Sequence, residues 1–255
     1  MSKLPDEYKF VDLSDYGRPV ARYIANSLEN TDVTPIHVTG WFVISGLISI
    51  ACILSGNYYL AALFLILKSI LDAADGELAR IKKTPSYAGR YLDSVSDIIL
   101  NLLIILSIWY ITDHPFYIAL LAFICIQLQG TLYNFYYVIL RTSANGDKTS
   151  QIFENEVPSA MKGEKQRHVN FLFNSYKLLY GLFDRIIYAM DRQAATSDKF
   201  PKWFMTPLSA YGLGFQLLLI SLFLVSGLKA LILPFFILYS VFIIVFIGTR
   251  RLFLN

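Results

Sequence analysis

Four aspartates within a stretch of 26 residues are the part of this sequence best suited to chemistry: Asp72, Asp75, Asp93 and Asp97. They form two pairs whose members are three or four residues apart, so each pair would share one face of a helix. Hard divalent cations such as Mg²⁺ take oxygen ligands. Two such ions, about 3.5–4 Å apart, suit in-line displacement at phosphorus. The spacing therefore predicts a site for metal-assisted chemistry at phosphorus.

The link between the two pairs predicts that they face each other. Residues 81–88 contain Pro85 and turn the chain back, so the helices on either side should be antiparallel neighbours. Four facing carboxylates would repel one another, and a pair of divalent cations would neutralise them. Arg80 stands one turn beyond Asp75 and offers a forked donor to phosphate or carboxylate.

These helices are expected to lie in a membrane. The chain is 55% hydrophobic with a mean hydropathy of +0.50, and its apolar residues gather into long runs near the roughly 20 residues needed to cross a bilayer. We expect an all-α integral membrane protein with six spans, at about 37–56, 58–80, 89–112, 115–140, 207–227 and 229–249. Because ionisable groups inside a span are costly, the aspartates are a functional-site hypothesis.

The basic residues near the span ends predict the orientation. All but Lys229 fall on one side: Arg80, Lys82, Lys83, Arg90, Arg141, Lys199, Lys202, Arg250 and Arg251. The positive-inside rule then places both termini and the aspartates on the cytosolic side. In a bacterium, the membrane would be the cytoplasmic membrane.

Two segments of this single domain, 1–255, are not expected to span. Residues 17–30, within a cytosolic N-terminal segment 1–34, suit a short interfacial helix. The cytosolic segment 141–206 begins as a polar loop and continues as an amphipathic helix over about 167–192. Its apolar positions recur in steps of three and four, at Leu172, Tyr176, Leu179, Phe183, Ile187 and Met190.

The stretch 72–97 resembles the signature of the CDP-alcohol phosphotransferase family. That family carries the pattern D-x2-D-G-x2-A-R-x8-G-x3-D-x3-D, and this chain matches it at all eight fixed positions. Eight positions form a far more specific signal than a short motif. The six-span layout, with the motif bridging the second and third spans, is also similar to the family.

The resemblance implies an activity, its cofactors and its site residues. The activity is Mg²⁺- or Mn²⁺-dependent transfer of a phosphoalcohol from a CDP-alcohol to an alcohol, releasing CMP in phospholipid biosynthesis, by a homodimer. Asp72, Asp75 and Asp93 would hold two ions, and Asp97 would complete the second metal site and act as general base. Contacts with the CDP moiety are implied for Gly76, Ala79, Arg80, Ser86 and Gly89.

A shorter, partial match to the family lies at the start of the first span. Many family members carry Pro-Asn-x-x-Thr there, and this chain has Pro35 and Thr39 but Ile36 in place of Asn. The resemblance implies a nucleotide contact from Thr39 and puts one from position 36 in doubt.

The substrates stay open at this level. The donor is CDP-diacylglycerol with a polar acceptor, or a soluble CDP-alcohol with a lipid acceptor. A phosphorylated acceptor would suit Lys82, Lys83, Arg90 and Arg141, although basic residues in cytosolic loops also follow from the topology.

Other polar residues inside the spans have two interpretations each. Lys68, four residues before Asp72, either balances the aspartates or touches a donor phosphate, or it packs elsewhere without a chemical role. Gln127, Thr131 and Asn134 share a face that either lines an acceptor pocket or forms hydrogen bonds between helices. Asn101 extends the stripe of Asp93 and Asp97.

Several features exclude or weaken other classes. A net charge of +3 does not indicate a nucleic-acid partner, and no secretory signal precedes the first span. Cys52 and Cys125 lie in apolar runs and are expected to pack as small core residues. Pro234 predicts a kink in the sixth span. An ion-coupled transporter would also place carboxylates in spans, but it predicts acidic or broken-helix features in both halves, and the last two spans contain no acid.

Overall fold

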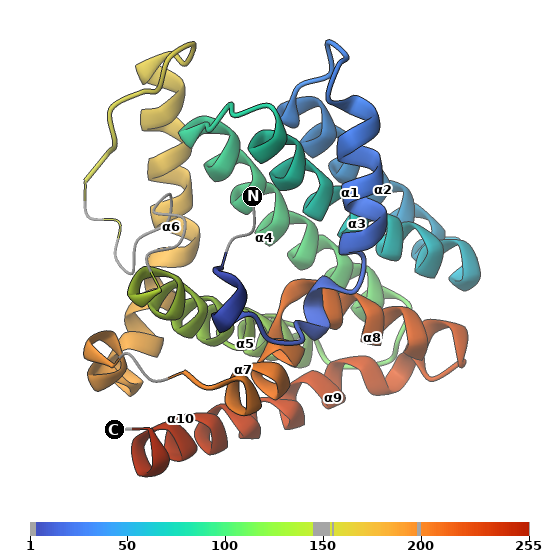
Figure 1. Cartoon of the computed structure of the whole chain (residues 1–255). Coiled ribbons are helices and arrows are strands. Elements are labelled where there is room, and N and C mark those ends of the chain that lie inside the picture. Colours follow the sequence, from blue (N-terminus) through green and yellow to red (C-terminus); the bar gives the residue numbers. More distant parts are fainter. Residues whose placement is uncertain (1–3, 145–153, 155, 198–199, 255) are drawn as a thin grey trace.

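The computed structural model describes residues 4–144, 154, 156–197 and 200–254, and every regular element in these ranges is a helix (Figure 1). The polar stretch 145–153 and Lys199 lie outside the described residues. The chain is an all-helical protein whose long helices pack side by side.

The first layer consists of α1 (Arg18–Leu28), α2 (Pro35–Leu54) and α3 (Tyr58–Ile81). Thr34 caps α2 by accepting a hydrogen bond from a backbone N–H of the first turn, and Pro35 occupies the first helical position. Gly56, with φ +78°, supplies the left-handed backbone of the tight turn between α2 and α3. The three helices share an apolar core, so α1 and α2 hold α3 in place.

A short turn joins α3 to α4 (Tyr87–Tyr110), which begins two residues before the expected third span. Ser86 caps α4: its Oγ accepts a hydrogen bond from the N–H of Gly89 at 2.7 Å. Lys83 has the left-handed φ of +54° that reverses the chain. The turn therefore makes α3 and α4 antiparallel, as predicted.

The second layer contains α5 (Phe116–Ser143) with α8 (Leu213–Val225) and α9 (Ile232–Tyr239), tied together by Gln129. Its Nε2 donates to the carbonyl of Phe236 at 2.9 Å, and its Oε1 accepts from Gln216 at 3.1 Å. Both glutamines are buried, and their hydrogen bonds satisfy amide groups that would otherwise be unpaired in an apolar core.

The span expected at 207–227 is helical over most of its length, but to picture it as one straight helix would be wrong. α7 (Lys202–Leu208) and a 3₁₀ turn at Ser209–Tyr211 precede α8, and the two parts are bent by 53°. A Cβ at Gly214 would lie 2.0 Å from the carbonyl oxygen of Ser14, so the N-terminal segment packs directly against the bend. The backbone is interrupted where this segment approaches.

The expected kink at Pro234 is also wrong. Pro234 lies in the first turn of α9, where a backbone N–H has no partner within the helix in any case. The helix is interrupted instead at Ser240, between α9 and α10 (Val241–Phe253), where Gln129 donates to the Ser240 hydroxyl at 2.8 Å.

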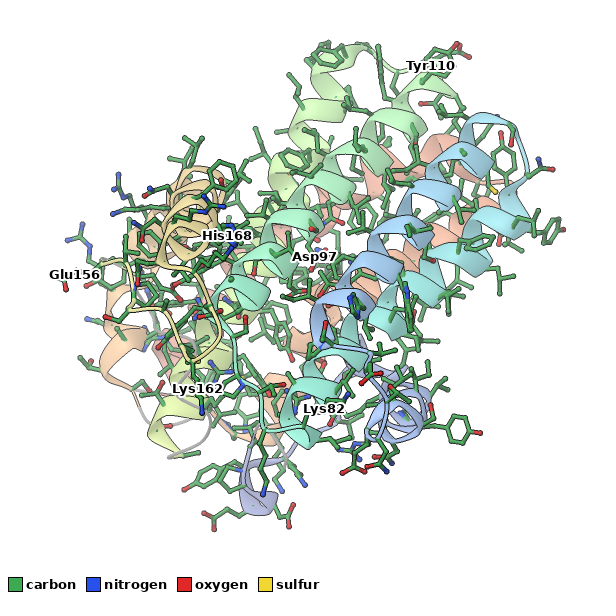
Figure 2. All side chains as sticks on the ribbon, turned by 90° about the horizontal axis from the view of Figure 1, so that it is seen from above. Lys82, Asp97, Tyr110, Glu156, Lys162 and His168 are labelled. Carbon is green, nitrogen blue, oxygen red and sulfur yellow. The ribbon has the colours of Figure 1, made fainter. Side chains whose placement is uncertain are left out.

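Among the residues that the structure describes, four helices are long and apolar enough to cross a membrane: α2, α4, α5 and the combined helix Lys229–Phe253. The bent pair of α7 and α8 makes a fifth if it forms one span. α3 has 24 residues but also carries Lys68, Asp72, Asp75, Glu77 and Arg80, which lower its hydropathy. Figure 2 shows Lys82 and Lys162 toward one end of the long helices and Tyr110 at the other end.

The predicted amphipathic helix is α6 (Gln166–Met190), which packs across α4 and α5 and stands upright at the side of the bundle in Figure 1. Its buried side chains are Val169, Phe173, Phe183 and Ile187. The predicted positions Leu172, Tyr176 and Met190 are partly buried against the same cores, so the predicted apolar stripe faces the bundle. After α6, the carboxylate of Asp191 accepts from Arg250 Nε at 2.7 Å and joins this helix to the end of α10.

Candidate active site

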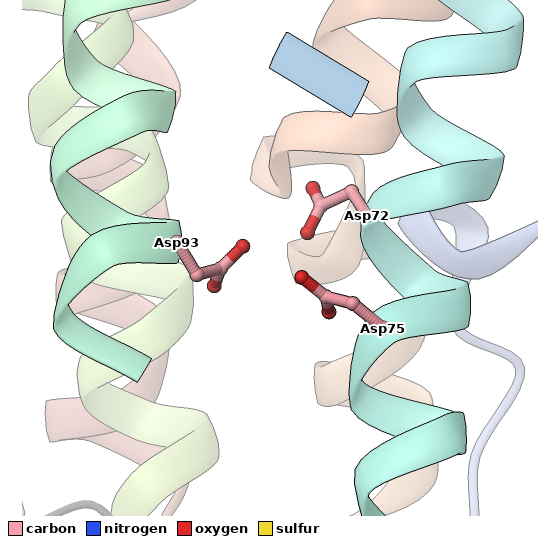
Figure 3. Close-up of side chains that lie close together, drawn as sticks. All are labelled: Asp72, Asp75 and Asp93. Carbon is pink, nitrogen blue, oxygen red and sulfur yellow. The ribbon is translucent and has the colours of Figure 1, made fainter. Parts of the chain in front are cut away.

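Three carboxylates converge between α3 and α4 (Figure 3). Asp72 and Asp75 project from adjacent turns of α3, and Asp93 projects toward them from α4. One oxygen from each of the three lies within 4.8 Å of the others. Because the turn at 82–86 makes the two helices antiparallel, stripes that are separate in the sequence meet here, as predicted.

The environment of these oxygens fits a divalent cation. Asp75 is only 8% exposed, and within the described ranges Asp93 Oδ1 is buried without a hydrogen-bond partner. A buried carboxylate oxygen without a partner is costly, and a cation bound by all three carboxylates would remove that cost. Oxygen-only ligands favour a hard ion such as Mg²⁺.

Asp97, the fourth aspartate, is engaged differently. Its carboxylate pairs with the ammonium of Lys68, which also lies 3.5 Å from Asp72 Oδ2. Lys68 is completely buried, and its Nζ lies 4.9 Å from the centre of the Phe42 ring. Of the roles considered for Lys68, the structure places it against the aspartates as a balancing charge.

Thr39 brings α2 into the site. Its hydroxyl donates to Asp75 Oδ2 at 2.7 Å, and Thr39 itself is 3% exposed. A hydroxyl that donates to one oxygen of a carboxylate fixes the direction of the other. Thr39 therefore orients Asp75, an interaction that the sequence did not reveal.

Glu77 connects the signature arginine to the N-terminal helix. Arg80 Nη2 lies 3.2 Å from Glu77 Oε1, and Arg18 Nη1 reaches the same oxygen at 3.0 Å. A Cβ at Gly76 would lie 3.5 Å from Arg80 Nη1, so the guanidinium folds back over the glycine. Sequence analysis missed Glu77, although three acids on one short stretch of helix are a signal.

The start of α4 is held by a second glutamate. The Ser86 hydroxyl donates to Glu164 Oε1 at 2.6 Å while capping the helix at Gly89. A Cβ at Gly89 would lie 3.0 Å from Ser86 Oγ, so the cap favours the glycine. The signature residue Gly89, and Ser86 in the variable link before it, thus both have a structural role here.

The four basic residues considered for the acceptor lie in different settings. Lys82 donates to the carbonyls of Thr31 and Val33, at 2.6 and 2.8 Å. Arg90 pairs with Glu154, Lys83 is exposed in the turn, and Arg141 is buried near the end of α5.

The polar face of α5 borders a cavity. Thr131 and Asn134 line a space of about 20 Å³ together with Tyr176 and Asp184 of α6. In the described part of the chain, Gln127 Nε2 and Thr131 Oγ1 are buried without a hydrogen-bond partner, which does not support hydrogen bonding between helices as their role. Burial raises the pKa of Asp184 to about 6.

Tyr180 is a further neighbour of the site that sequence analysis missed. Its hydroxyl donates to the Ser94 carbonyl at 3.0 Å, between Asp93 and Asp97 on α4. Burial, followed by the charge of Asp97, raises its pKa well above the usual value, so the hydroxyl stays protonated.

The sequence model of the family described as CDP-alcohol phosphatidyltransferase matches residues 33–159. This range contains α2 to α5, and with them all four aspartates and Thr39. No individual curated protein matches the chain.

Proposed function

Because this chain belongs to the CDP-alcohol phosphatidyltransferase family, a family of transferases for substituted phosphate groups, we propose that it transfers a phosphoalcohol from a CDP-alcohol to an alcohol, with release of CMP. The observation that carries this proposal is the convergence of Asp72, Asp75 and Asp93 between α3 and α4. The site is part of a membrane-embedded helical bundle, where a lipid substrate can reach it.

The proposed reaction is a single displacement. The acceptor oxygen attacks the phosphorus that is remote from cytidine, a new P–O bond forms, and the bond to the bridging oxygen breaks so that CMP leaves. Asp97 takes the proton of the acceptor hydroxyl. A covalent intermediate on the protein is not needed, because positioning and charge stabilisation supply most of the catalysis in such transfers.

Asp72, Asp75 and Asp93 would hold the first of two Mg²⁺ ions, and Asp97 would complete the site of the second; Mn²⁺ would also serve. Bound there, the ions would neutralise the diphosphate and the leaving group. The unpartnered Asp93 Oδ1 supports this assignment.

The donor would lie over the small residues of the signature, with its phosphates near Arg80. Space for it comes from Gly76, Ala79 and Gly89, and polar contacts are proposed from Ser86 and Thr39. We propose CDP-diacylglycerol as the donor, with a soluble CDP-alcohol and a lipid acceptor as the alternative. The acceptor contacts are proposed at Arg141, Lys83, Arg90 and Lys82, the last two of which would exchange their present partners.

We further propose six spans, a site that faces the cytosol, and a homodimer. The clustering of basic residues at the end of the bundle that carries the α3–α4 turn supports this orientation.

The test is CMP release by the purified protein with Mg²⁺, CDP-diacylglycerol and a panel of head-group alcohols. Asp93→Asn should lower kcat at least 10³-fold, because it removes a charged ligand that faces both α3 carboxylates. Asp113→Asn, in the turn at the opposite end of the bundle, is the matched control and should keep full activity. Native-like CMP release by Asp93→Asn would reject the proposed site. A parallel panel of soluble CDP-alcohols with diacylglycerol distinguishes the two donor classes.

A further inference from the structure

Lys68 stands on α3 one turn before Asp72, on the side of the aspartates that points into the bundle. Its ammonium pairs with Asp97, lies 3.5 Å from Asp72 Oδ2 and rests over the ring of Phe42. The side chain has no exposure to solvent. The signature begins at Asp72 and so does not include this lysine.

The ammonium separates Asp97 from the other three carboxylates. Asp72, Asp75 and Asp93 approach one another within 4.8 Å, and Asp97 does not join this group. Its carboxylate is directed to Lys68 instead. A second divalent cation that uses Asp97 would therefore share this carboxylate with a buried ammonium.

A formal charge count shows when the binding of a second cation is favourable. The four aspartates and Lys68 together carry three negative charges. One divalent cation leaves a single negative charge, whereas two would leave a net positive charge in a buried site. The second cation would thus enter a site that keeps only one negative charge and would lie beside a buried ammonium, so it is attracted far less strongly than the first.

The diphosphate of a CDP-alcohol changes this balance, because each of its phosphates carries a negative charge near neutral pH. With the donor bound, two divalent cations leave the same single negative charge that one cation leaves in its absence. The donor also supplies phosphate oxygens, which can bind the second cation and can pair with the ammonium of Lys68.

We propose that Lys68 makes the second metal position conditional on the donor: the resting protein binds one divalent cation at Asp72, Asp75 and Asp93, and the second binds only together with the diphosphate. This inference rests on the proposed function for the nature of the donor. Lys68 is a positioning residue in this scheme, because it acts through Asp97.

The experiment counts Mn²⁺ bound per chain by equilibrium dialysis of the detergent-purified native protein. One sample contains no CDP, and the other contains saturating CDP on both sides of the dialysis membrane. CDP carries the diphosphate but no alcohol to transfer. We expect one ion per chain without CDP and two with it. Electron paramagnetic resonance should show spin coupling between two close Mn²⁺ ions only in the sample with CDP. Two ions without CDP, or one in both samples, would overturn the proposal.

Lys68→Met keeps the length of the side chain and removes its charge. It should bind two ions without CDP, while Lys229→Met, at the far end of the bundle beside Tyr58, should keep the native count. Asp97→Asn removes the carboxylate that the second ion needs and should bind one ion in both samples. A count of one in folded Lys68→Met without CDP would show that Lys68 does not control the second position.

These counts are independent of turnover. A native protein that takes up its second ion only with CDP supports the role of Lys68 even if no alcohol is transferred. A protein that releases CMP but binds two ions without CDP contradicts this inference and leaves the proposed function intact.

Discussion

At the scale of residues, the site is built from carboxylates whose partners come from other helices. Asp75 is oriented by Thr39 of α2, and Asp97 is held by Lys68 of α3. Asp93 has a buried oxygen, Oδ1, without a hydrogen bond from the described residues. The proposed metal ligands therefore differ in how firmly they are fixed before an ion would bind.

Thr39→Val should weaken Mn²⁺ binding by about 10- to 100-fold, which is the usual cost of removing a hydrogen bond to a metal ligand. Valine keeps the shape of threonine but cannot donate to Asp75. Thr39→Ser keeps the hydroxyl and should bind as the native protein does. The measurement is a Mn²⁺ titration in detergent without nucleotide. An unchanged Mn²⁺ affinity in the valine variant would show that Thr39 does not support metal binding through Asp75. Its proposed contact with the nucleotide would then be its remaining role.

At the scale of elements, α6 is the part that departs most from a simple bundle. It packs across α4 and α5, covers the face of α4 that carries Tyr91 and Ser94, and closes a cavity with Asp184. Large apolar side chains on its other face are exposed, with Leu178 at 82%. A helix that packs against the bundle on one face and exposes large apolar side chains on another suits the membrane surface.

Asp184 should make the docking of α6 sensitive to pH. Burial raises its folded-state pKa to about 6 from an ordinary 3.8, so the folded protein binds the proton more tightly than the unfolded chain does. The contribution of the neutral Asp184 to stability is therefore fully present below about pH 4 and is lost as the pH rises through about 6. Asp184→Asn removes this cost and should stabilise the protein by about 2–3 kcal/mol at pH 7.5 but hardly at pH 4.

Unfolding in detergent at both pH values measures this difference, with Asp113→Asn as the control that should show no such dependence. Equal stabilisation by Asp184→Asn at both pH values would show that the carboxyl is not neutral in the folded protein at low pH.

At the scale of the whole molecule, the two ends of the bundle differ in charge and chemistry. The turn at 82–86 and the start of α6 lie toward one end, and Tyr110 and the turn at 111–115 lie at the other (Figure 2). Thr84 and Asp113 are exposed in these two turns and report on opposite ends.

In a variant with Cys52 and Cys125 replaced by alanine, a single cysteine at Thr84 should react with an impermeant maleimide only from the cytosolic side. A single cysteine at Asp113 should react only from the other side. Inside-out and right-side-out vesicles make this comparison. Reaction of both cysteines from the same side would contradict the proposed topology.

The sequence by itself determined the family, the acidic stripes and the positions of most helices. Spacings of three and four residues set which side chains share a face, so Asp72 with Asp75 and Asp93 with Asp97 followed from local geometry alone. The family match over residues 33–159 confirms the resemblance on which the rest was built. The bounds of α2 to α5 agree with the expected spans to within three residues.

Only the tertiary structure decided which partner each of these residues takes. Lys68 is in reach of both Asp72 and Asp97. Its closer partner is Asp97, because α4 brings that carboxylate up to the ammonium. The bend before α8 lies where Gly214 meets Ser14, about 200 residues away in the sequence. A hydrogen bond or ion pair between helices depends on distances that no local periodicity contains, so these contacts become visible only when the helices are packed.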